Sequence, residues 1–264
     1  MTRVRPAAVA GGFYPAEPGE VRRALEAAFA DAVPPPAGAP VPKALVVPHA
    51  GYVYSGAVAA SAYLRLAHAH DAPARVVLLG PNHRVPLLGM AVSSADAFAT
   101  PLGLVTVDAS ARERALALPS VRVNDTVHAP EHSLEVQLPF LQAVLDDVPV
   151  LPVVVGQCAT SDVVALLDEL WGGPETLVLV STDLSHYHAY EDAVALDRHT
   201  IAAIAALRPE GVGDRDACGA YPLRGLLAAA AARGLATEVL DVRNSGDTAG
   251  DRRSVVGYGA VAVG

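Results

Sequence analysis

Three short apolar segments of this chain each end in a loop that carries a histidine. Residues 45–47 run into Pro48-His49, residues 76–79 run into Gly80-Pro81-Asn82-His83, and residues 177–180 lead to a loop that ends at His186. Short apolar runs bounded by such loops are typical of strands buried inside an α/β sheet. Proline cannot donate to a sheet ladder and biases the preceding residue towards extended backbone, so the first strand should end at Pro48.

The carboxyl ends of these strands form the edge of the predicted sheet where ligands bind in open α/β folds. A single histidine in such a loop is usually a hydrogen-bonded structural residue. Three histidines in the same context favour a shared site, because a metal or acid/base centre needs side chains that converge from different strands. We therefore expect His49, His83 and His186 to lie together at this edge.

The rest of the chain fits a large globular α/β fold. Of the 264 residues, 52% are hydrophobic and 18% are charged, which is far from a disordered composition. Apolar strands alternate with helical patterns from the N-terminus to a closing strand at residues 255–263. This alternation predicts a three-layer α/β/α sandwich with a mostly parallel central sheet.

Charge and cysteine content limit the possible partners and the compartment. The 19 Lys and Arg residues against 28 Asp and Glu residues give a formal net charge of −9, which argues against nucleic acid or an anionic membrane as the main partner. No apolar run has the length of a membrane span or of a signal sequence. Two cysteines, Cys158 and Cys218, suit a reducing compartment, so we expect a cytoplasmic protein.

The most polar segment of the chain, residues 124–135, runs directly into an apolar helix predicted for residues 136–144. Ser133 is a plausible N-cap of that helix. The carboxylates of Glu131 and Glu135 then have two interpretations. They are either partners of the site histidines, or only a charge cluster that favours the N-terminus of the helix.

Five motifs taken together resemble the Memo family over nearly the whole chain. They are Pro48-His49-Ala50-Gly51-Tyr52, Gly80-Pro81-Asn82-His83, the segment from Glu131 to Glu135, the segment from Ser181 to His186, and Cys218-Gly219. That family includes a eukaryotic mediator of receptor-driven cell motility and the prokaryotic proteins called AmmeMemoRadiSam system protein B. It shares its fold with LigB-type class III extradiol dioxygenases, so the resemblance implies one LigB-type domain over residues 1–264.

The resemblance also implies one transition-metal ion held by His49, His83 and Cys218. Two imidazoles and a thiolate suit iron or copper, and also zinc. Cys218 precedes a predicted helix whose N-terminal dipole would favour the thiolate. The alternative for a cysteine is a small buried apolar residue, which is our interpretation of Cys158.

Other residues of the motifs acquire expected roles in the same way. By resemblance, His186 lies beside the metal as an acid/base group, and Asp183 is a candidate to orient it. Metal-bound imidazoles usually donate their other N–H to a carboxylate or a carbonyl. The candidates for such support or for substrate binding are Glu131, His132, Glu135, Tyr52 and Asn82.

The function implied by the family remains open between three hypotheses. Ring-cleaving extradiol enzymes hold Fe(II) with two histidines and a glutamate, whereas Cys218 occupies the third position here, so ring cleavage does not follow from the fold. The protein is a redox or dioxygenase-like metalloenzyme, a metal-stabilised module that binds a peptide or a partner protein, or an enzyme with Cys218 as a nucleophile activated by His186. The substrate is then a small molecule or a peptide, and the prokaryotic family implies radical SAM and AMMECR-type protein partners.

Overall fold

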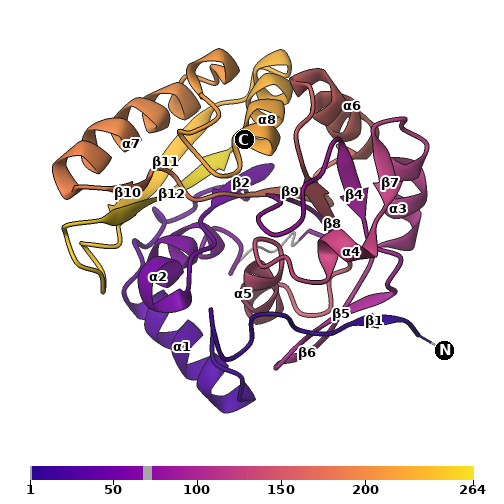
Figure 1. The fold of residues 1–264 in the computed structure, drawn as a ribbon, viewed down its shortest axis with the longest axis horizontal. Coiled ribbons are helices and arrows are strands. Elements are labelled where there is room, and N and C mark those ends of the chain that lie inside the picture. The colour runs from indigo at the N-terminus through magenta and orange to yellow at the C-terminus, as the bar shows by residue number, and fades with distance from the viewer. Residues whose placement is uncertain (1, 68–72) are drawn as a thin grey trace.

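A nine-stranded sheet lies between two layers of helices (Figure 1). The computed structural model describes residues 2–67 and 73–264. The strands follow one another across the sheet as β10 (His186–His188), β12 (Val255–Val263), β2 (Ala44–Val47), β9 (Thr176–Ser181), β3 (Arg75–Pro81), β8 (Val150–Val155), β4 (Met90–Val92) and β7 (Val121–Val123), and β11 (Thr237–Asn244) pairs with β12. The predicted three-layer α/β/α architecture is confirmed.

The prediction of a mostly parallel sheet is wrong, because the sheet is mixed. The four central strands β2, β9, β3 and β8 are parallel. On one side β12 is antiparallel to β2, and on the other side β4 is antiparallel to β8. Parallel neighbours need a long crossover, whereas β11 and β12 follow each other without an intervening helix and pair as antiparallel strands.

Alternate residues of the central strands face the two helical layers. In β2, Leu45 and Val47 pack into one core, and Ala44 and Val46 pack into the other. Figure 1 shows helices along both sides of the sheet. The first core is covered by α1 (Pro18–Ala30), α2 (Tyr52–Tyr63) and α5 (Leu138–Val144), and the second by α3 (Ala109–Leu116), α6 (Thr160–Leu170), α7 (Tyr190–Ala205) and α8 (Ala220–Ala232).

A second, three-stranded sheet places the N-terminal segment against the body of the fold. It consists of β1 (Val4–Arg5), β5 (Ala97–Thr100) and β6 (Gly103–Thr106), in the order β1, β5, β6. The remaining elements are the short helix α4 (Asp125–His128) and the 3₁₀ helices η1 (Glu135–Gln137) and η2 (Pro209–Gly211).

The helix expected from residue 136 starts differently in the structure. It opens as the 3₁₀ turn η1 and continues as α5. Ser133 does not cap it, because the Ser133 hydroxyl donates to the carbonyl of Pro81 at 2.8 Å. The end of β3 therefore lies directly against the polar segment 131–135, and a Cβ at Gly80 would come within 2.9 Å of Ser133 Oγ.

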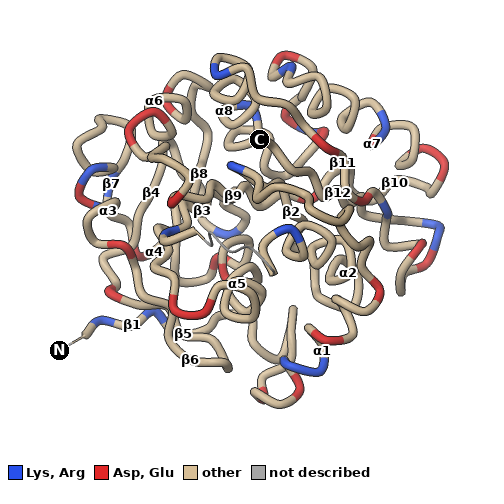
Figure 2. Tube along the Cα trace, turned by 180° about the vertical axis from the view of Figure 1, so that it is seen from behind, with Lys and Arg blue, Asp and Glu red and all other residues tan. Residues whose placement is uncertain are grey.

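Charged residues lie mainly on the helices and loops around the sheet (Figure 2). The strands β2, β9 and β8 carry no Lys, Arg, Asp or Glu, and β3 carries only Arg75 at its start. Among the described residues, no helix combines the length and the apolar character that a membrane span requires.

His128 at the end of α4 is a buried structural histidine. Its side chain is about 1% exposed, and Nε2 donates to the carbonyl of Ala91 at 2.9 Å. Burial lowers the pKa of His128 to about 4, although the hydrogen bond to Ala91 opposes the shift. The ring is therefore neutral in the folded protein at neutral pH.

This burial makes the stability of the protein depend on pH. Because the pKa of His128 is about 4 when folded and about 6.5 when unfolded, the unfolded chain binds more protons below pH 6.5. The contribution of His128 to the stability is fully present above pH 6.5 and is lost as the pH falls towards 4. Between pH 7 and pH 5 we expect His128 to remove about 2 kcal/mol from the free energy of unfolding.

A His128→Gln variant, which keeps a donor for Ala91, should lack that part of the loss. Urea unfolding of the metal-free wild type and variant at both pH values measures the difference, in which the contributions of other histidines cancel. Equal pH dependence of the two proteins would contradict the assignment.

Candidate functional site

A cavity of about 510 Å³ opens at the carboxyl ends of β2, β9 and β3. The ends of β2 and β9 are joined where their loops begin, because the amide of Thr182 donates to the carbonyl of Val47 at 2.8 Å. Six of the residues expected in the site line this cavity: His49, His83, His132, Asp183, His186 and Cys218.

Three of the lining histidines are close enough to share a metal ion. One ring nitrogen from each of His49, His83 and His132 lies within 4.8 Å of the other two. His49 and His132 are buried, whereas His83 is exposed at the cavity. His132 was expected to support the ligands, whereas its ring lies as close to His49 and His83 as a shared metal ion would require.

The hydrogen bonds of His83 fix its protonation pattern. Nδ1 lies 2.9 Å from Glu131 Oε1, and the amide of His83 donates to Oε2 at 2.6 Å. Burial alone would raise the pKa of Glu131. The hydrogen bonds from His83 and from the amide of Ser133 outweigh this effect and lower the pKa to about 2. An ionised carboxylate only accepts, so Nδ1 carries a proton, and in the neutral ring Nε2 is then the nitrogen with the lone pair. Glu131 is thus a partner of a site histidine and more than a charge at a helix end.

The other two histidines of the group are neutral at pH 7. Burial lowers the pKa of His49 far below its usual range, and the neighbouring His83 adds to the shift. Burial and the nearby His49 and His83 lower the pKa of His132 to about 3. Nδ1 of His132 is buried 3.3 Å from Glu131 Oε1, without hydrogen-bond geometry and without another partner among the described residues. Neutral imidazoles are the form that binds metal.

Cys218 reaches the site from the residues that precede α8. Its Sγ lies 3.2 Å from His49 Nε2 and accepts the amide N–H of Asp183 at 3.2 Å. The approach is close because residue 219 is glycine: a Cβ there would lie 2.7 Å from Thr182 Cβ. Burial and the charge of Asp183 raise the pKa of Cys218, so the helix N-terminus alone does not produce a thiolate.

Asp183 and His186 line the cavity, but their hydrogen bonds differ from the expectation that Asp183 orients His186. Nδ1 of His186 donates to the carbonyl of Leu184 at 2.8 Å, so Nε2 is the nitrogen with the lone pair. The Asp183 carboxylate instead accepts the backbone N–H of His49 at 2.7 Å. Burial raises the pKa of Asp183, whereas the hydrogen bond from His49 opposes this shift. The backbone therefore orients His186, and Asp183 holds the loop of His49.

Besides Glu131, which contacts His83 from outside the lining, three expected residues lie outside the lining of this cavity. Asn82 stabilises the turn after β3, where its Nδ2 donates to the carbonyl of Val85 at 2.9 Å. The Tyr52 hydroxyl donates to the carbonyl of Val136 at 2.7 Å. Glu135 is fully buried under the N-terminal segment, where it forms an ion pair with Arg5 and accepts the hydroxyl of Tyr14.

Glu135 acts on the site indirectly, by fixing the segment that carries Phe13. Its carboxylate also accepts the amides of Ala8 at 2.7 Å and Val9 at 3.0 Å. The ring of Phe13 packs on His132, with 4.4 Å between the ring centroids. The N-terminal segment is therefore one wall of the cavity that contains the three histidines.

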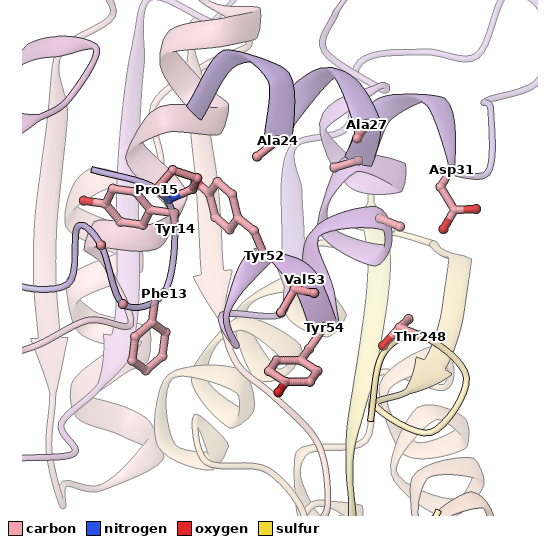
Figure 3. A pocket seen from close by; sticks show the side chains of 14 residues that line it. Phe13, Tyr14, Pro15, Ala24, Ala27, Asp31, Tyr52, Val53, Tyr54 and Thr248 are labelled. Atoms are coloured by element: carbon pink, nitrogen blue, oxygen red, sulfur yellow. The ribbon is translucent and has the colours of Figure 1, made fainter. Parts of the chain in front are cut away.

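Phe13 also lines a second cavity, of about 550 Å³ (Figure 3). Figure 3 shows Phe13, Tyr52 and Tyr54 around it, with Ala24, Ala27 and Asp31 of the α1 region at its other end. Tyr52 thus belongs to the neighbouring cavity.

Further residues of the site could not be predicted from the motifs. Phe13 lies in an N-terminal loop with no histidine, and the exposed Arg84 only follows His83 in the sequence. Tyr187 has a positive φ of 63°, an uncommon conformation for a bulky residue, and its side chain is 78% exposed at the cavity. Its position next to His186 was the only available signal.

Comparison with known proteins extends over nearly the whole chain. Residues 5–262 match the family described as Memo-like protein. The chain is 37% identical to a MEMO1 family protein of Aquifex aeolicus, over 97% of each chain, and 38% identical to one of Ignicoccus hospitalis, over 98% of each. The crystal structure of an uncharacterized protein of Escherichia coli K12 has a TM-score of 0.53 at 13% identity, with 84% of this chain and 99% of that chain covered, which shows the fold alone.

The buried ion pair between Arg5 and Glu135 leads to a stability prediction. Breaking a buried ion pair leaves an unpaired buried charge, which costs about 3–5 kcal/mol. We expect Glu135→Gln to lower the free energy of unfolding by about that amount, because the Arg5 side chain is only 5% exposed. Urea unfolding measures the loss.

The matched control is Glu169→Gln, which breaks the pair between Arg114 and Glu169, whose side chains are both 42% exposed. An exposed pair contributes less than about 1 kcal/mol. A similar loss in both variants would show that the buried ion pair contributes no more to stability than the exposed one.

Proposed function

The chain belongs to the Memo family, and we propose that it binds one transition-metal ion in the cavity at the sheet edge and uses this ion in catalysis. The observation that carries the proposal is the group of three histidines whose ring nitrogens lie within 4.8 Å of one another. Neutral imidazoles beside a cysteine are a donor set that fits iron, copper or zinc, and we propose iron or copper as the native metal.

Two of the proposed ligands are His49 and His83. Nδ1 of each ring is hydrogen-bonded to a neighbouring side chain, to Ser181 and Glu131 respectively, so Nε2 is the nitrogen available to a metal. The third proposed ligand is Cys218, because its Sγ is 3.2 Å from His49 Nε2. That separation is close to the roughly 3.5 Å between two ligands of one tetrahedral ion with bonds of about 2.0–2.3 Å. His132 is the competing third ligand, since it completes the histidine group.

Such an ion, when bound, would serve as a Lewis acid or a redox centre for a substrate in an open coordination position. The chain itself contributes a proton acceptor and a shaped cavity. The carbonyl of Leu184 holds His186 so that its Nε2 lone pair is free to accept a proton from a bound group. A cavity of about 510 Å³ accommodates a small molecule or the side chain of a peptide, and these are the substrate classes we propose.

The alternatives have weaker support from the geometry. A cysteine nucleophile needs a base beside it, yet the ring nitrogen next to Cys218 Sγ belongs to His49, and burial raises the pKa of the thiol. A metal-stabilised module that only binds a peptide or a partner, including radical SAM or AMMECR-type proteins, would use the same ligands. It would not need a free lone pair on His186.

The proposed ligands can be tested by metal content. We expect His49→Ala, His83→Ala and Cys218→Ala each to lower the number of ions per chain sharply, because each removes one of three protein ligands. Elemental analysis after anaerobic purification and loading with Fe(II) measures this. Cys158→Ala is the matched control, since burial raises the pKa of Cys158 to about 11 and it lies outside the cavity. Full metal content in both histidine variants would refute the site.

The third ligand can be identified in the cobalt-substituted protein. A thiolate bound to Co(II) gives a charge-transfer absorption that imidazole does not give. We expect this band in the wild type and in His132→Gln, and its loss in Cys218→Ser. A wild-type protein that binds Co(II) without the band, together with loss of Co(II) in His132→Gln, would assign the position to His132.

The role of His186 can be separated from metal binding. We expect His186→Gln to keep the metal content of the wild type and to lower turnover by about 10²–10⁴-fold, the usual contribution of an acid/base group. Oxygen uptake by the Fe(II)-loaded protein over a panel of dihydroxy-aromatic compounds and short peptides measures turnover. His188→Gln is the control, because His188 is an exposed histidine of the same strand β10.

Two outcomes would change the interpretation of His186. Unchanged turnover in His186→Gln would remove it from the mechanism. A wild-type protein that holds its metal but turns over no compound of the panel would favour the binding module.

A further inference from the structure

A chain of buried hydrogen bonds lies behind His49. Nδ1 of His49 is 2.9 Å from the Oγ of Ser181, the last residue of β9, and both residues are buried. Either atom can donate in such a pair, and the direction decides which ring nitrogen keeps its lone pair. The surroundings of Ser181 determine that direction.

The Ser181 hydroxyl has a single proton, which it donates to a backbone carbonyl. Oγ lies 2.6 Å from the carbonyl oxygen of Ser133, which can only accept. Oγ also accepts from Nε2 of Gln137 at 2.8 Å. Towards His49 it can therefore only accept. Nδ1 of His49 must carry the ring proton, and Nε2, which faces Cys218, is left with the lone pair.

The orientation of Gln137 is equally constrained. Its Nε2 also donates to the carbonyl of Pro48 at 2.9 Å, and a reversed amide would place two oxygens against each other there. Its Oε1 accepts the hydroxyl of Tyr63 at 2.8 Å. Tyr63 and Gln137 are about 0% and 1% exposed, so no solvent competes for these bonds.

We infer that Ser181 is a positioning residue that fixes the Nδ1–H tautomer of His49 and thereby presents Nε2 to the metal. The tautomer itself is a property of the metal-free chain. Only its purpose, to leave Nε2 free for a metal ion, rests on the proposed function. His83 and His186 reach the same tautomer through Glu131 and Leu184. The structural His128 has the opposite one, since it donates from Nε2 to Ala91.

The tautomer can be read directly by NMR. In metal-free protein with ¹⁵N-labelled histidine, the ring nitrogens of His49 are assigned by their loss in His49→Gln. We expect a protonated Nδ1 and an unprotonated Nε2 in the wild type. In Ser181→Ala the acceptor is gone, so the proton should move in part or fully to Nε2. Zinc affinity, measured by competition with a chelator, should then fall by about 10–100-fold.

Tyr63→Phe is the matched control, because it removes a hydroxyl from the same buried chain while Pro48 still orients Gln137. It should keep the wild-type tautomer of His49 and the wild-type zinc affinity. A purely structural role of Ser181 would change stability in Ser181→Ala but leave the tautomer as it is.

The inference is overturned by an Nε2–H tautomer in the wild type, or by Ser181→Ala with wild-type tautomer and affinity. If Ser181→Ala does not fold, the wild-type spectrum still tests the inference, because an Nε2–H tautomer overturns it and an Nδ1–H tautomer supports it. If the wild type binds neither zinc nor Fe(II), the proposed metal function fails, whereas the spectra of the metal-free wild type and variant still test Ser181.

Discussion

Parallel pairing of β2, β9 and β3 is the constraint on which the site depends. The register sets Val47 opposite Ser181, and Leu79 opposite Val180, so the three strands end at nearly the same level. Their apolar side chains are buried on both faces, and a shift would disrupt the close packing on each face, so this packing holds the register. Loops that leave adjacent strand ends must then converge. His49, Asp183 and His83 meet for that reason, although 134 positions separate His49 from Asp183 in sequence.

Burial controls the protonation of several groups around the cavity. Burial keeps the imidazoles of His49 and His132 neutral, as a metal requires. Glu131 is the exception, since it is an ionised carboxylate that is almost fully buried. It is stabilised by the amides of His83, His132 and Ser133 and by the ring of His83. The loop after β3 and the segment after α4 are therefore held together by one side chain, which also orients a proposed ligand.

Sequence patterns could predict the features that depend on strand ends. The apolar runs with terminal histidines located His49, His83 and His186 at one edge, and the family resemblance added Cys218 and His132. The antiparallel flanks of the sheet could not be predicted in this way, because periodicity shows that a segment is a strand but not which neighbour it pairs with. The roles of Ser181 and Gln137 were missed, although Ser181 begins one of the motifs, because serine and glutamine at buried positions have no distinctive pattern.

Glu131 and Glu135 show where local sequence stops being informative. They belong to one short motif, yet Glu131 faces the site and Glu135 faces the N-terminal segment. Residues 131–135 do not form a regular helix, so spacing along the motif does not tell which way each side chain points. Contacts distant in sequence decide it: Glu135 meets Arg5, 130 positions away.

The ion pair between Arg5 and Glu135 also has a consequence for folding during synthesis. A chain leaves the ribosome from its N-terminus, so Arg5 and Phe13 emerge long before their partners. The wall that Phe13 provides cannot form until residues 128–135 have been synthesised, and the contact between His49 and Cys218 spans 169 positions. Contacts of such sequence separation slow folding, since the entropy of loop closure must be overcome first. The cavity is therefore among the last parts of the molecule to take shape during synthesis, and the proposed metal ligands come together only on a nearly complete chain.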